Sequence, residues 1–177
     1  LIVLVYLVTL TRVDVRFAGA FILGLVVVLL GLSATKFFVE VVPLAVPLQS
    51  VWLVIHVFVA SLSVALFALA FAMSVLQLMQ ARRAQKQSGP RFLVTLPTAE
   101  RLELLTYRFI TIGFVLWTFT LIAGAIWASS AWARYWGWDV KEVWTFIIWV
   151  LYAGYIHARA TRGWRGTRSA WLSIIGF

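Results

Sequence analysis

The chain has 177 residues, of which 63% are hydrophobic and 12% are charged, with a net charge of +9 and no cysteine. A soluble domain is about half apolar and a quarter charged, so the composition excludes an ordinary soluble protein and indicates a polytopic membrane protein. Without cysteine, the chain forms no disulfide and offers no thiolate ligand to a metal. It begins at apolar Leu1 and stops inside another apolar run, from which we expect a fragment of a longer protein.

Apolar runs alternate with shorter polar segments along the chain. Because lipid offers no partner to backbone polar groups, runs of this length should form helices, and the expected fold class is an all-α, polytopic transmembrane bundle of about six helices with the first and last truncated. We expect the helices at residues 1–10, 17–32, 52–80, 104–126, 143–158 and from 170 onward. Pro43 and Pro47 predict an irregular segment at 33–51. Basic and small polar residues predict a basic cytoplasmic loop at 81–103.

The basic residues are divided unevenly between the two sets of alternating loops. Twelve of the fifteen Lys and Arg residues lie in or beside the segments 11–16, 81–108 and 159–168, and the other three are Lys36, Arg134 and Lys141. Short basic loops stay on the cytoplasmic side of a membrane. We therefore expect 33–51 and 127–142 to share the outer face. This distribution explains the positive charge better than binding of nucleic acid does.

The segment 127–144, WASSAWARYWGWDVKEVW, is the most distinctive part of the chain. It holds half of the ten tryptophans, namely Trp127, Trp132, Trp136, Trp138 and Trp144. Tryptophans often form belts at membrane interfaces, which is the simpler interpretation for Trp117 and Trp171. The cluster is too dense for a belt alone, and flat indole rings can stack on a planar ligand such as haem.

Within this segment, Trp132 and Trp136 would share one face if the chain is helical there. Gly137 would let the backbone turn before Trp138. Arg134 or Lys141 could pair with haem propionates. Alternatively, Asp139 and Glu142 pair with those two bases and hold the shape of the loop.

The two histidines, His56 and His157, are candidate ligands of haem iron. His56 is four residues after Trp52, on the same helix face, and on the side of the tryptophan segment. His157 lies near the other end of its helix, fifteen residues or roughly 22 Å beyond Glu142, too far to share one iron with the tryptophan segment. For each histidine, the simpler interpretation is an interfacial side chain with no ligand.

The residues AWARYWGWDVKEVW, followed by YIHARATRGWRG, resemble the tryptophan-rich WWD signature of the CcsA/ResC family (also called CcsB) of system II cytochrome c biogenesis. PLQSVWLVIH, which ends at His56, also resembles this family, whereas the first 45 residues match it only in hydrophobic character. The family usually has proline after the aspartate of the motif, where this chain has Val140.

The resemblance implies export of haem b across the membrane and presentation of reduced haem to the CXXCH thiols of apocytochrome c. It implies a role as the haem-presenting subunit of a cytochrome c haem lyase, together with a Ccs1/ResB-type membrane partner. The protein would lie in a bacterial plasma membrane or a plastid thylakoid, with the tryptophan segment outside. His56 would be an outer axial ligand and His157 an inner one, and the family's second outer histidine would lie beyond Phe177. The candidate haem-binding residues are His56, His157, Trp127, Trp132, Arg134, Trp136, Trp138 and Asp139.

Two alternatives stay open at this point. One is a haem-binding transporter without a role in covalent attachment. The other is a membrane scaffold that binds no haem and whose tryptophans form an interfacial belt.

Overall fold

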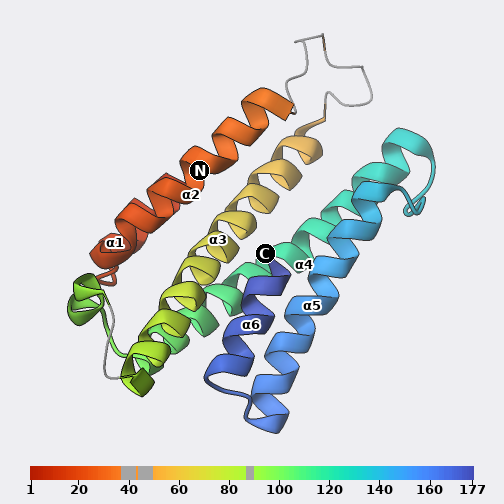
Figure 1. Cartoon of the computed structure of the whole chain (residues 1–177). Helices are drawn as coiled ribbons and strands as arrows, with labels where there is room; N and C mark the ends of the chain where they lie inside the picture. The colour runs from red at the N-terminus through yellow and green to blue at the C-terminus, as the bar shows by residue number, and fades with distance from the viewer. Residues whose placement is uncertain (37–42, 44–49, 87–89) are drawn as a thin grey trace.

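The structure is a computed structural model that describes residues 1–36, 43, 50–86 and 90–177. The regular structure in these residues is entirely helical, which confirms the all-α prediction (Figure 1). The α-helices are α1 (Ile2–Leu10), α2 (Gly19–Lys36), α3 (Val51–Lys86), α4 (Ala99–Trp132), α5 (Val140–Arg162) and α6 (Thr167–Gly176). Two short 3₁₀ helices, η1 (Arg16–Ala18) and η3 (Arg91–Thr95), precede α2 and α4.

The helices around the predicted basic loop 81–103 are longer than expected. The helix α3 continues to Lys86, because the Arg, Gln and Lys residues after position 80 are good helix formers. The helix α4 starts at Ala99, where the Thr98 side chain accepts a hydrogen bond from the Arg101 backbone N–H and caps the helix. The prediction of a loop over the whole of 81–103 was therefore wrong. Most of the predicted irregular segment 33–51 lies outside the described residues, but α2 continues to Lys36.

The antiparallel pair α3 and α4 forms the centre of the bundle. Close approach is possible at Gly113 of α4, where an added Cβ would lie 2.7 Å from the Phe67 ring of α3. The Ser63 hydroxyl of α3 donates a 2.7 Å hydrogen bond to the Gly113 carbonyl at the same level. Small residues of this kind let helix backbones pack closely in a membrane. Around this centre, α1 and α2 pack on one side of α3, while α6 lies against both α3 and α5 (Figure 1).

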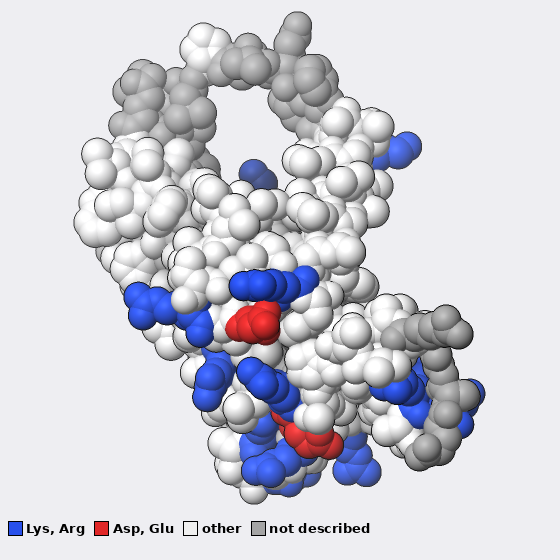
Figure 2. All heavy atoms as spheres, turned by 90° about the vertical axis from the view of Figure 1, so that its left-hand side faces the viewer, with Lys and Arg blue, Asp and Glu red and all other residues white. Residues whose placement is uncertain are grey.

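The connections between helices collect at two opposite ends of the bundle (Figure 1). We call one the basic end, formed by the connections at 11–15, 90–98 and 163–166, and the other the tryptophan end, formed by the connection at 133–139. Figure 2 shows most of the Lys and Arg side chains of one face gathered over its lower half, toward the basic end. Three helical stretches, Arg16–Lys36, Val51–Lys86 and Ala99–Trp132, are long and apolar enough to cross a membrane, so the chain is an integral membrane protein.

Candidate functional site

The connection at the tryptophan end is folded around the carboxylate of Glu142. Glu142 Oε2 accepts hydrogen bonds from the backbone N–H of Gly137 at 2.6 Å and of Asp139 at 3.3 Å. The Asp139 side chain accepts a 2.9 Å bond from the Glu142 N–H, which completes a capping box at the start of α5. The two acidic residues thus hold the loop through its backbone. They do not pair with Arg134 or Lys141 in the described contacts.

The backbone of this connection turns at residues other than the one expected. Ala133 and Trp138 have positive φ angles of 54° and 57°, a conformation that costs energy for a residue with a side chain. Gly137 instead provides room, because a Cβ there would overlap the guanidinium group of Arg134. Arg134 therefore folds back on its own loop.

The tryptophans form two edge-to-face pairs. The rings of Trp127 and Trp132 have centroids 4.8 Å apart, and those of Trp136 and Trp138 have centroids 5.8 Å apart. Trp132 and Trp136 do not share a helix face, because the condition for it is not met: α4 ends at Trp132. Trp138 is 74% exposed, and neither Trp138 nor the exposed Trp144 lines the pocket described next.

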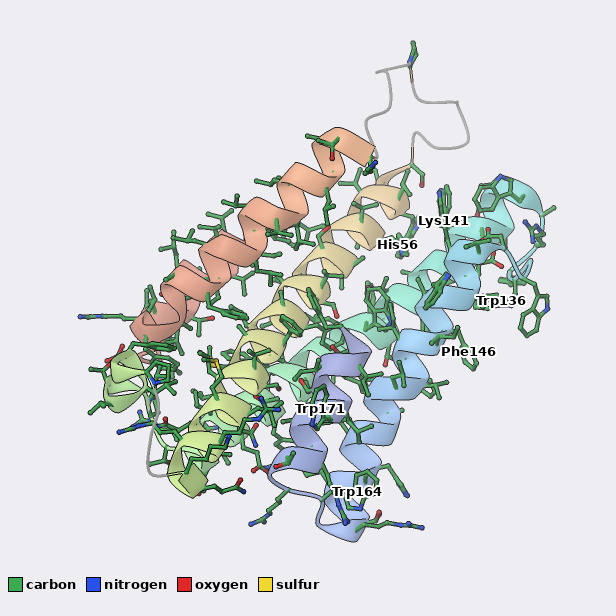
Figure 3. All side chains as sticks on the ribbon, viewed as in Figure 1. His56, Trp136, Lys141, Phe146, Trp164 and Trp171 are labelled. Carbon is green, nitrogen blue, oxygen red and sulfur yellow. The ribbon has the colours of Figure 1, made fainter. Side chains whose placement is uncertain are left out.

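A pocket lies between α3, α4 and the start of α5. Its walls include His56, Trp127, Trp132, Trp136, Asp139 and Lys141. The structure therefore brings His56 together with three of the candidate tryptophans. Figure 3 shows His56 and Lys141 near each other at the upper ends of α3 and α5. Arg134 and Trp138 do not line this pocket.

His56 is held against α4 by two contacts. Its Nδ1 lies 3.0 Å from the Thr120 carbonyl oxygen, and a Cβ added to Gly124 would lie only 2.8 Å from its Cε1. A carbonyl oxygen only accepts hydrogen bonds, so Nδ1 carries the proton and the neutral ring keeps its lone pair on Nε2. This is the arrangement found in metal-binding histidines, in which one nitrogen is fixed by a hydrogen bond and the other binds the metal.

His157 lies elsewhere. It is exposed on α5 near the basic end and does not line the pocket. It follows Asp139 by eighteen residues, or roughly 27 Å of helix. No group of three or more His, Asp or Glu side chains that could hold a metal ion occurs among the described residues.

A buried ion pair near the basic end was not anticipated from the sequence. Arg159 Nη1 lies 2.6 Å from Glu103 Oε1, and the side chains of Arg159 and Glu103 are 13% and 9% exposed. The other oxygen of Glu103 accepts bonds from the Gly166 N–H at 2.9 Å and from Gln77 at 3.4 Å. The carboxylate thus joins α3, α4, α5 and the connection to α6. The available signal was an acidic residue, Glu103, placed between two leucines at a position that we had assigned to a loop.

The whole chain, residues 1–177, matches the family model described as cytochrome C assembly protein. It is 39% identical over 155 residues to the cytochrome c biogenesis protein CcsA of Synechococcus sp. (strain RCC307), covering 76% of this chain and 50% of the relative. CcsA of Guillardia theta is 38% identical over 150 residues, with 76% and 50% covered. CcsA of Prochlorococcus marinus (strain MIT 9515) is 40% identical over 149 residues, with 73% and 48% covered. The chain thus spans about half the length of the curated relatives that it matches.

Proposed function

The chain belongs to the cytochrome c assembly protein family and is of the CcsA type, and we propose that its tryptophan end holds haem for attachment to apocytochrome c. The observation that carries the proposal is the fixed orientation of His56. Its Nδ1 is bonded to Thr120 at 3.0 Å, which leaves Nε2 free to bind iron at a pocket lined by tryptophans.

The side chains of the pocket suit a haem chemically, but the pocket is smaller than a haem. An imidazole ligand and several indole walls suit an iron porphyrin. The pocket volume is about 150 Å³, similar to an engineered cavity that takes up benzene. Haem binding therefore requires the pocket to widen. The backbones of α3 and α5 are not closely packed, and the ring stack of Phe67 on Tyr152 that joins these two helices lies outside the pocket lining, so the pocket can widen while that stack is kept.

Lys141 is the better candidate for the propionates. It is exposed at the rim of the pocket, whereas Arg134 is folded onto Gly137. Asp139 and Glu142 are engaged in the capping box, so their role in the proposal is to position the loop. Trp127, Trp132 and Trp136 would contact the ring, and Trp138 would lie outside it.

The proposal extends to the route of haem and to the partners. The distribution of basic residues supports an outward orientation of the tryptophan end. His157 would serve an earlier site on the cytoplasmic side, and its exposure on α5 suits a second ligand supplied by a Ccs1/ResB-type partner. The haem supplies vinyl groups, to which the CXXCH thiols of the apocytochrome add. This chain would hold the ring in the orientation that the addition needs.

The test is the absorption spectrum of the full-length protein purified with its partner. We expect His56→Ala to lose haem from the outer site and to regain it when imidazole is added. His157→Ala is the matched control. If His157 supplies haem to the outer site, the variant lacks haem at both sites in cells, but the purified variant still binds added haem at the outer site. A haem spectrum unchanged by His56→Ala would contradict the proposal. A preparation that never binds haem would favour the scaffold alternative, and haem binding without cytochrome c maturation would favour the transporter.

A further inference from the structure

The interface between α5 and α6 contains buried polar groups that the proposed haem site does not use. The hydroxyls of Tyr152 and Ser173 and the amide oxygen of Gln77 have no hydrogen-bond partner among the described residues. The Tyr155 hydroxyl lies beside the Arg159 side chain but forms no hydrogen bond of good geometry with it. All four side chains are at least 98% buried. A buried polar atom without a partner costs about 1–3 kcal/mol, and native proteins rarely leave several together.

These groups lie at successive levels of one interface. Gly176 of α6 faces Tyr152 of α5, because a Cβ on Gly176 would be 3.1 Å from the carbon that carries the Tyr152 hydroxyl. The two helices are antiparallel neighbours joined by a short turn (Figure 1). One turn toward the basic end, the same register brings Tyr155 level with Ser173.

One further turn brings Arg159 level with Ser169, beside the buried ion pair of Arg159 and Glu103. Gln77 approaches the same point, since its Nε2 lies 3.1 Å from the Gly166 carbonyl oxygen and 3.4 Å from Glu103. The polar groups thus lie in a row that starts at the ion pair, whose arginine side chain is 13% exposed at the basic end.

The other end of the row is closed by aromatic side chains. The Phe67 ring stacks on the Tyr152 ring with centroids 3.9 Å apart, and Trp117 packs edge-on against Phe67 at 6.1 Å. The Trp117 N–H is bonded to the Thr145 carbonyl oxygen, so this side chain is satisfied. Polar groups end at Tyr152, and apolar packing follows.

We infer that the α5–α6 interface binds a row of ordered water molecules from the Glu103–Arg159 ion pair to Tyr152, open toward the basic end and closed by Phe67. The row covers about seven residues of α5, or roughly 10 Å. Buried water usually makes about three hydrogen bonds, which the tyrosine, serine and glutamine oxygens supply. Water and protons from the basic end thereby reach the interior of the bundle without a path to the tryptophan end.

X-ray hydroxyl-radical labelling of the purified full-length protein tests this inference, because radicals form from water next to the side chain that they modify. We expect Tyr155 and Tyr152 to be labelled despite their burial, and to take up ¹⁸O when the solvent is H₂¹⁸O. Trp117 is the control, since it is 6% exposed and lies beyond Phe67. Labelling of both tyrosines no faster than that of Trp117 would overturn the inference.

A double-mutant cycle provides a second measurement. If Tyr155 and Ser173 share water, Tyr155→Phe and Ser173→Ala each lower the unfolding temperature, and the double variant loses less than the sum of the two. If the interface is dry, each substitution removes an unsatisfied group and raises the unfolding temperature. A higher unfolding temperature for Tyr155→Phe would therefore also overturn the inference.

Discussion

Replacing Gly124 with alanine should weaken haem binding while leaving the helix intact. The added Cβ would lie 2.8 Å from His56 Cε1 and 3.2 Å from Nδ1. Carbon atoms pack at about 3.5–4.0 Å, so the ring must move by roughly 0.7–1.2 Å away from α4. That movement stretches the 3.0 Å bond from Nδ1 to Thr120 beyond hydrogen-bond distance. Loss of such a supporting bond typically costs about 10–100-fold in metal affinity.

The assay is titration of the purified full-length protein with haem, followed by absorption, alongside thermal unfolding. Alanine is more favourable than glycine in a helix by about 0.8–1.0 kcal/mol, so the unfolding temperature of Gly124→Ala should not fall below that of the wild type. Gly154→Ala in α5 is the matched control, because no atom lies within 4 Å of its added Cβ, and its haem affinity should equal that of the wild type. Wild-type affinity in Gly124→Ala would refute the idea that this face of α4 holds His56 in position for iron.

Three further results are expected. Lys141→Gln should weaken binding of haem by about two- to fivefold, the range of an exposed ion pair, without affecting haem dimethyl ester, whereas Arg134→Gln should not discriminate between them. Equal effects on acid and ester would exclude Lys141 from the propionates. Glu103→Ala should lower the free energy of unfolding by about 3–5 kcal/mol, because it leaves its arginine partner buried and unpaired, and a loss below about 1 kcal/mol would contradict the geometry. A cysteine placed at Ser130 should react with an impermeant thiol reagent from outside intact cells and one at Thr167 should not; the reverse pattern would invert the proposed topology.

The number and order of the helices could be predicted because a helix that crosses the bilayer needs about twenty apolar residues in a row, and such runs are visible in the sequence. The ends of the helices depend on single capping contacts, and these were missed. The segment 127–132 continues α4 because it contains no glycine or proline, and α5 starts at Val140 because Asp139 and Glu142 cap it.

The proximity of His56 to the tryptophan segment was expected from the side of the membrane that both share. The contacts of Thr120 and Gly124 with His56 could not be predicted, since they depend on how α3 and α4 are rotated against each other. The direction of a single side chain in a loop also cannot be predicted from hydropathy. For that reason, the separation of Trp136, which lines the pocket, from Trp138, which does not, emerged only from the structure.

The length of α4 has a consequence for how a ligand is oriented in the pocket. Its 34 residues extend about 51 Å, whereas the hydrocarbon layer is about 30 Å thick. If the exposed Arg108 marks one boundary of the hydrocarbon and α4 runs along the membrane normal, Thr120 lies about 18 Å into the hydrocarbon and Trp132 lies about 36 Å along, beyond the opposite boundary. With that placement, the pocket spans a steep dielectric gradient, with its His56 wall at the depth of the hydrocarbon and its Lys141 rim at the depth of the headgroup layer. An amphiphilic ring that enters has its charged edge turned toward the rim by solvation alone, before any side chain binds it.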